Sequence, residues 1–288
     1  MSTPSPLAAG RGLRVMRRSG LPRRVCRVRP GLRIDVRHSA SLCYALQQSA
    51  WRWLQGIRLQ NDGERIPAGA ELVVQLAPVL TTPWRLPLAE LPAGAVFDVP
   101  VPDLPLRAEV FANLVEGARA ELVVALERDG ATLAEHRSPI DLLAYNEWPG
   151  LRPLPGLLAA FVAANHPSLT PLLQVAAAAL QRATGDPALD GYQRRSPARV
   201  QALVEAVHDA VTGVGITYVG APPSYERQGQ KVRTPEQVVG ERLGTCLDLA
   251  VLYAAVFEHV GLEPLVVLVR GHAFVGVWLQ PTSSPHVE

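Results

Sequence analysis

The stretch GTCLDLAVLYAAVFEHVGLEPLVVLVRGHAFVGVW, residues 244–278, decides the fold of the second half of this chain. It places Cys246 before a long apolar run and His272 after it. Residues 247–260 have the length and composition of a buried helix. Residues 264–270 are rich in β-branched side chains, and an alternating pattern follows from His272. We therefore predict one helix followed by two strands.

Simple geometry brings the two polar residues of this stretch together. A helix over residues 247–260 carries the chain about 21 Å away from Cys246. A strand over residues 264–270 returns it by about 23 Å. His272 then lies near the helix N-terminus, level with Cys246, so the spacing permits contact between them.

Cysteine beside histidine is the arrangement needed for acyl transfer through a thioester. The positive end of a helix dipole and a neighbouring imidazolium both favour thiolate, and the histidine then acts as general acid to the leaving group. The backbone N–H of Cys246 and an upstream amide, Gln230 or Gln237, are candidates to stabilise the oxyanion. Gln237 is the weaker candidate because it stands three residues after Thr234, where a capping box explains it. The alternative is that Cys246 and His272 are ordinary structural residues.

Composition indicates a folded protein without a membrane-spanning segment. The 288 residues are 48% hydrophobic and 19% charged, which suffices for a sizeable core in two domains. No apolar stretch reaches the roughly 20 residues that a membrane span needs. Cys26, Cys43 and Cys246 are too few and scattered for a disulfide framework or a CxxC metal site. We expect a cytoplasmic protein with no metal and no cofactor.

Charge is distributed unevenly along the chain. Residues 1–30 contain eight arginines and no acid, and we expect them to be a disordered basic leader. Since the whole chain carries +2, the remainder carries −6. Direct binding of nucleic acid is therefore not supported, apart from non-selective contacts of the leader.

Residues 31–144 read as a β-domain. Short alternating or apolar runs are broken by Pro and Gly, a texture typical of a β-sandwich of the immunoglobulin-like kind. Asp129-Gly130 between two such runs predicts a tight hairpin, because both residues tolerate positive φ. The pattern does not indicate what this domain does.

Residues 151–288 read as a second, α+β domain, which follows a boundary at YNEWPG. Three Thr-Pro or Ser-Pro pairs precede Ala- and Leu-rich runs, so we expect N-caps at Thr170, Ser196 and Thr234. The predicted fold class is thus α+β, with a β-sandwich followed by a helix-rich α+β domain.

The segment RTPEQVVGERLGTCLDLAVLYAAVFEHVGLEPLVVLVRGHAFVGVWL, residues 233–279, resembles the core of the transglutaminase-like (papain-like) cysteine-enzyme superfamily. There a helix-capping cysteine follows a glycine, and a histidine follows in a GHAF-type strand. The resemblance implies a thiol hydrolase or acyltransferase with Cys246 and His272 as its pair and a peptide or protein as substrate. PPSYERQGQKVRTPEQV, residues 222–238, further resembles a bacterial multidomain group in which this module precedes a superfamily 1 helicase and a nuclease-like domain. Association with such components is expected on that ground, although no GxxxxGK[ST] phosphate loop occurs.

One feature departs from the family pattern. The superfamily places an orienting Asp or Asn on the strand after the histidine, and residues 273–288 contain neither. Asp248 is the nearest acid, but its position in the first turn of the helix also suits a structural role. We expect that the chain stops before the third residue of the catalytic triad. The alternatives are that the enzyme works with a Cys-His dyad, or that it has lost activity.

Two functional hypotheses follow. The first is an amide hydrolase or acyltransferase, and the motif does not distinguish hydrolysis from transamidation. The second is an inactive interaction module of a nucleic-acid-directed defence system of the helicase and nuclease type.

Overall fold

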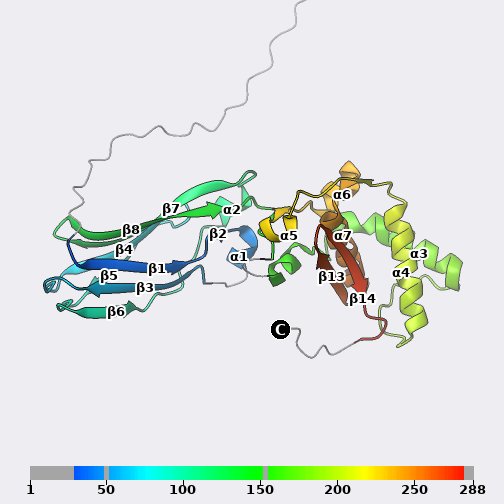
Figure 1. The fold of residues 1–288 in the computed structure, drawn as a ribbon. Helices are drawn as coiled ribbons and strands as arrows, with labels where there is room; N and C mark the ends of the chain where they lie inside the picture. The colour runs from blue at the N-terminus through cyan, green and yellow to red at the C-terminus, as the bar shows by residue number, and fades with distance from the viewer. Residues whose placement is uncertain (1–28, 49–51, 152–154, 282–288) are drawn as a thin grey trace, which may run out of the picture.

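The computed structural model describes residues 29–48, 52–151 and 155–281, and it is mixed α+β as predicted. Nearly all of the predicted basic leader, residues 1–30, lies outside the described residues. The strands of the first half lie at one end of the molecule and the helices α3 and α4 at the other (Figure 1). No helix in the described residues is both long and apolar enough to span a bilayer.

Two sheets enclose the hydrophobic core of the first half. One has the strand order β2-β8-β7-β4-β5 and the other β1-β3-β6. Their inward side chains, among them Leu59, Leu72, Leu122 and Ile140, are fully buried in one cluster. The elements are β1 (Leu32–His38), β2 (Ser41–Leu42), α1 (Tyr44–Gln48), β3 (Leu54–Asn61), β4 (Ala70–Ala77), β5 (Trp84–Leu88), β6 (Ala95–Val99), α2 (Ala108–Ala112), β7 (Ala118–Arg128) and β8 (Ala131–Leu142).

The hairpin prediction at Asp129-Gly130 is confirmed. Asp129 has φ 49° and Gly130 has φ 76°, and the two residues join β7 to β8 with Arg128 opposite Ala131. Positive φ at both central residues is the type I′ geometry, whose twist matches that of the flanking strands. The local sequence therefore fixes the turn and the pairs next to it, and the register shifts once further along, between Leu126 and Glu127.

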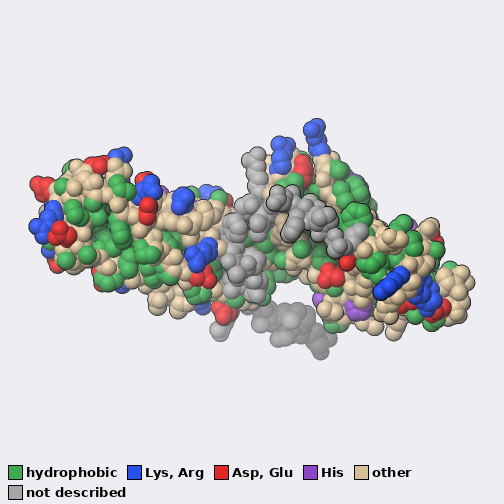
Figure 2. All heavy atoms as spheres, turned by 90° about the horizontal axis from the view of Figure 1, so that it is seen from below, with side chains coloured by type: hydrophobic (Ala, Val, Ile, Leu, Met, Phe, Trp, Pro, Cys, Tyr) green, Lys and Arg blue, Asp and Glu red, His purple; other side chains and the backbone are tan. Residues whose placement is uncertain are grey.

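Charges of both signs are interspersed on the surface. On the face in Figure 2, basic and acidic side chains alternate over the strand-rich end. Cross-strand ion pairs such as Arg58–Asp98 and Arg119–Asp141 account for part of this pattern. These pairs are exposed to solvent, so each contributes little to stability.

The described part of the second half contains three long helices, α3, α4 and α7, together with shorter helices and short strands. The elements are β9 (Glu147–Trp148), the 3₁₀ helices η1 (Pro155–Phe161) and η2 (Pro167–Leu169), α3 (Thr170–Thr184), α4 (Pro197–Thr212), β10 (Thr217–Tyr218), α5 (Tyr225–Gln228), β11 (Gln230–Lys231), α6 (Pro235–Glu241), β12 (Leu243–Gly244), α7 (Cys246–His259), β13 (Pro264–Val269) and β14 (His272–Val277). The predicted helix and two strands are therefore present as α7, β13 and β14.

Two of the three predicted N-caps are confirmed and one is wrong. Ser196 accepts from the backbone N–H of Arg199 in α4, and Thr234 forms a capping box in α6. Thr170, in contrast, is already helical, with φ −52° and ψ −46°. The reason is that η2 runs directly into α3, so that a turn of helix precedes the expected cap.

Helix α7 is the centre of the second core. Ten of its side chains are buried, which requires neighbours on more than one side. The antiparallel β13–β14 hairpin covers one side, with Val269 opposite His272 and Pro264 opposite Val277. Helices α4 and α6 pack on other sides (Figure 1).

The predicted boundary segment YNEWPG contributes to this second core. Its residues 147–148 form β9, which pairs with β11 so that Trp148 lies opposite Gln230. The Trp148 side chain is fully buried in the cluster that contains Cys246. The connection between the two halves is thus part of the packing around α7.

We predict that Gly229→Ala destabilises the protein by about 2–4 kcal/mol in urea unfolding. Gly229 has φ +83°, and a Cβ there would lie 2.1 Å from the carbonyl oxygen of Trp148. The matched control is Gly240→Ala in α6, where a Cβ meets no atom within 4 Å. That change should be neutral or stabilising by up to about 1 kcal/mol. Equal effects of the two substitutions would contradict the prediction.

Candidate functional site

The first turn of α7 is held by a buried capping box. Thr245 is the N-cap: its hydroxyl accepts from the backbone N–H of Asp248, and Asp248 Oδ2 accepts from the backbone N–H of Thr245 at 2.9 Å. This reciprocal arrangement satisfies donors that a helix start leaves unpaired. It fixes the position of Cys246, the first residue of the helix.

Asp248, the weak candidate for a third catalytic residue, has a structural environment. Its side chain is fully buried and also accepts from the backbone N–H of Arg233 at 2.8 Å and from Arg233 Nη1 at 2.9 Å. Both carboxylate oxygens are therefore occupied. Within the described part of the chain, no hydrogen bond joins Asp248 to His272. Asp248 therefore links the start of α7 to Arg233, which lies just before α6.

Cys246 is buried, and its thiol faces a tyrosine. The side chain is 3% exposed, and Sγ donates to the hydroxyl of Tyr225 with 3.6 Å between Sγ and Oη. Burial raises the pKa of Tyr225, and the neighbouring Cys246 raises it further. Tyr225 therefore keeps its proton at a pH where a thiol ionises. It can then donate to the thiolate, reversing the hydrogen bond.

A second tyrosine reaches the same sulfur from another segment. β10 pairs in parallel with β12, which places Tyr218 opposite Gly244, two residues before Cys246. Burial of its hydroxyl, and then the charge and hydrogen bonding of Cys246, raise the pKa of Tyr218. Tyr218 is 55% exposed, and it lines the same cleft as Cys246.

The two oxyanion candidates occupy different places. Gln230 is buried in β11, and its Nε2 donates to Thr245 Oγ1 at 3.0 Å, one residue before the nucleophile candidate. Its Oε1 is buried with no hydrogen-bond partner among the described residues. Gln237 lies in the capping box of α6, where Oε1 accepts from the backbone N–H of Thr234 at 3.0 Å. Of the two, Gln230 is the one that the structure links to the start of α7.

Cys246 and His272 line one cleft. His272 is exposed at the start of β14, and the cleft between α4, α7 and β14 has a volume of about 460 Å³. Its lining residues are Val204, His208, Tyr218, Cys246, Leu249, Ala250, Tyr253, Phe257, His272, Ala273, Phe274, Val275, Gly276 and Val277. The α7 members recur at helical spacing and so share one face of the helix. No direct hydrogen bond between the Cys246 and His272 side chains is present in the described residues.

The wall of the cleft opposite β14 is aromatic. His208 of α4 is hydrogen-bonded through Nδ1 to the hydroxyl of Tyr253 at 2.9 Å, and their rings stack with centroids 6.0 Å apart. Phe257 continues the row one helical turn further, 5.9 Å from Tyr253. This contact fixes α4 against α7 and gives the cleft an apolar wall.

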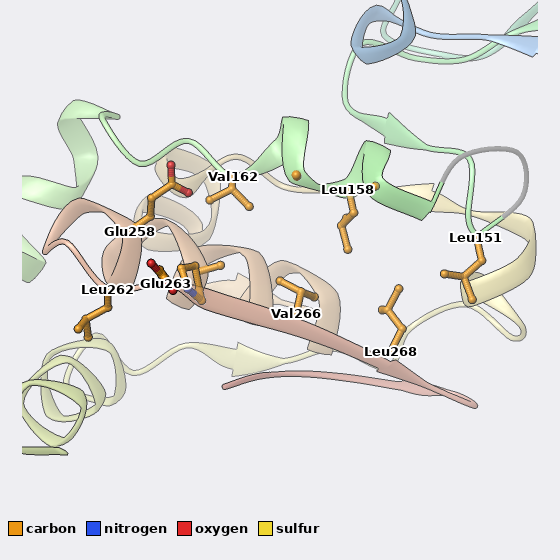
Figure 3. A pocket seen from close by; sticks show the side chains of 12 residues that line it. Leu151, Leu158, Val162, Glu258, Leu262, Glu263, Val266 and Leu268 are labelled. Carbon is orange, nitrogen blue, oxygen red and sulfur yellow. The ribbon is translucent and has the colours of Figure 1, made fainter. Parts of the chain in front are cut away.

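A larger cavity of about 700 Å³ lies between η1, α7 and β13. Figure 3 shows Leu158 and Val162 across from Val266 and Leu268, with Glu258 and Glu263 at one end. Neither Cys246 nor His272 lines it. The smaller cleft is the one that both groups line. Among the residues that the structure describes, no cluster of three His, Cys, Asp or Glu side chains is arranged to bind a metal ion.

Sequence reasoning missed Tyr218, Tyr225 and Arg233, which surround the start of α7. Tyr225 and Arg233 lie in the segment PPSYERQGQKVRTPEQV, whose pattern had been noted only as a resemblance. Nothing in the spacing marks Tyr218, because the parallel β10–β12 pair that positions it has two residues in each strand.

We predict that Asp248→Ala destabilises the protein by about 2–4 kcal/mol in urea unfolding, since it leaves buried donors of Thr245 and Arg233 unpaired. Asp209→Ala, on the exposed side of α4, is the matched control and should change stability by less than about 0.5 kcal/mol. A small effect of Asp248→Ala would show that the capping box is dispensable.

We predict that Tyr225→Phe slows iodoacetamide alkylation of Cys246 at neutral pH about fivefold, because the thiolate loses a hydrogen-bond donor. Mass spectrometry of the Cys246 peptide gives the rate. Tyr253→Phe is the control, since that hydroxyl bonds to His208 instead. An unchanged rate in Tyr225→Phe would mean that this hydroxyl does not stabilise the thiolate.

Comparison with known proteins gives no information on this site. No protein-family model matches the sequence, and a search of curated proteins also gives no match. The transglutaminase-like resemblance accordingly rests on the motifs around Cys246 and His272.

Proposed function

We propose that this chain is a cysteine-dependent amide hydrolase or acyltransferase with a transglutaminase-like α+β domain. One observation carries the proposal: Cys246, at the N-terminus of α7, lines the same cleft as His272. The order of α7, β13 and β14 is consistent with a cysteine on a helix and a histidine on a following strand.

In the proposed reaction His272 takes the proton of the Cys246 thiol, and the sulfur attacks the carbonyl carbon of an amide. The C–N bond then breaks as the imidazolium gives its proton to the leaving amine, which leaves a thioester. Attack by water gives hydrolysis, and attack by an amine gives transamidation; either releases the thiol. The free N–H groups of the first turn of α7 stabilise the oxyanion.

Gln230 acts in this proposal as a positioning residue. Its amide donates to the N-cap Thr245, and so supports the turn that presents Cys246. Tyr225 holds the sulfur from the buried side and Tyr218 from the exposed side. The substrate is a peptide or protein in the cytoplasm, and helicase or nuclease components are the proposed partners.

The second candidate function is a non-catalytic interaction module. Two observations favour it: in the described part of the chain no carboxylate is hydrogen-bonded to His272, and the Cys246 thiol bonds to Tyr225. In that case the cleft binds a partner without chemistry. The reactivity of the thiol distinguishes the two functions.

We predict that iodoacetamide alkylates Cys246 at neutral pH at least about tenfold faster than Cys43, and that His272→Ala removes this difference in rate. Mass spectrometry resolves each cysteine peptide. Cys43 is an internal reference in the same sample, because burial raises the pKa of its thiol. A slow reaction at Cys246 that His272→Ala leaves unchanged would contradict the enzyme and leave the interaction module.

A further inference from the structure

β14 is an edge strand that faces the cleft. It pairs with β13 along one side, and no described strand pairs with its other side. All six of its residues, His272–Val277, line the cleft. Successive side chains of a strand point to opposite faces, and Ala273 is buried whereas Phe274 is 47% exposed. Residues of both faces therefore meet the cleft along the main-chain edge of β14.

The cleft follows the edge of β14 and is lined mostly by apolar side chains. Six residues at about 3.3 Å each give an edge of about 20 Å, which matches an extended peptide of similar length. None of the lining residues is Asp, Glu, Lys or Arg, and α7 contributes Leu249, Tyr253 and Phe257 to the wall. A charged side chain would lose its hydration there without gaining a partner. A neutral, aliphatic side chain fits this wall.

One end of this edge lies at the candidate nucleophile. His272 begins β14, and Cys246 lines the same end of the cleft as the start of α7. Beyond the other end, the Tyr192 hydroxyl donates to the carbonyl of Trp278 at 2.7 Å and ties the chain after β14 to the α3–α4 connection. The edge of β14 thus runs from the Cys246 thiol at one end to the Tyr192–Trp278 hydrogen bond at the other.

We propose that this cleft binds its substrate as an added β-strand along β14, and that the substrate is an extended, uncharged peptide segment with aliphatic side chains. Main-chain hydrogen bonds to the edge of β14 supply affinity, and alternate side chains enter the apolar cleft and supply selectivity. This inference rests on the proposed function for its chemistry, and it names the substrate class of the same site. The peptide carbonyl lies at Cys246.

The test uses acetyl-Ala-Leu-Ala-Leu chloromethyl ketone, which alkylates a thiol: the S–C bond forms at the chloromethyl carbon and chloride leaves. Rates at Cys246 are measured by mass spectrometry on the full chain and compared with iodoacetamide. We expect the peptide reagent to alkylate Cys246 at least about tenfold faster than iodoacetamide does. Replacing either Leu of the reagent by Glu should lower the rate of alkylation at Cys246 about tenfold.

N-methylation of the reagent, one amide at a time, tests the added strand itself. In a strand every second N–H faces the neighbouring strand. We expect about a tenfold loss at two alternate positions and less than a threefold loss at the other two. A uniform effect of all four methyl groups, or no preference for the peptide reagent, overturns the proposal.

A binding experiment separates this inference from the nucleophile. Fluorescein-labelled Ala-Leu-Ala-Leu amide is titrated with the Cys246→Ala chain and followed by fluorescence anisotropy. Val204→Glu, in the cleft wall, should weaken binding about tenfold, whereas Val175→Glu on the exposed side of α3 should not. Binding with an unreactive Cys246 supports the strand site and refutes the enzyme. Fast iodoacetamide alkylation of Cys246 without peptide binding supports the enzyme and refutes the strand site. A dimer through β14 that excludes the peptide would make a second copy the occupant and overturn the proposal.

Discussion

Asp248 binds three donors from two segments without any contact with solvent. A buried carboxylate is tolerated only when hydrogen bonds and an opposite charge compensate its lost hydration. Thr245 and Arg233 supply that compensation, so the start of α7 and the strand-to-helix segment before α6 are held in one arrangement. The position of Cys246 depends on this local network.

The helix that begins there is apolar on all sides, and its burial organises the second half of the molecule. α7 needs cover from the β13–β14 hairpin, from α4 and from η1, and cavities remain on either side of the hairpin where that cover is incomplete. The larger cavity is lined by Glu258 of α7 but not by Cys246, and the smaller cleft opens onto Cys246. The chemistry of the site and the packing of the core are therefore two aspects of the same helix.

The surroundings of the thiol differ from a simple Cys-His pair. Tyr225 lies against Sγ on the buried side, and Tyr218 approaches it from the exposed side. A phenol whose pKa is raised stays a hydrogen-bond donor while a thiol ionises, so hydroxyl groups and imidazole can act on the same sulfur. In the described residues no carboxylate is hydrogen-bonded to His272, and Asp248 accepts from Arg233 and Thr245 instead.

Much of the local structure follows from the sequence, because the signals are local. Asp129-Gly130 dictates a primed turn, Ser196 and Thr234 cap their helices, and the change from a continuous apolar run to β-branched residues separates α7 from β13. Thr170 shows the limit of such signals: a preceding turn of 3₁₀ helix makes Thr170 itself helical, so the helix begins before the expected cap. Whether a polar side chain caps a helix depends on the chain before it.

The sequence by itself determined that the chain is mixed α+β, and that Cys246 and His272 return to the same level. Only the tertiary structure decided which side chains surround them. Tyr218, Tyr225 and Arg233 reach the start of α7 through short strand pairs and one buried ion pair, contacts between segments that leave no periodic trace in the sequence. The cleft along β14 likewise exists because α4, β10 and β14 lie around α7 and leave a space between them. That space is a property of the packing.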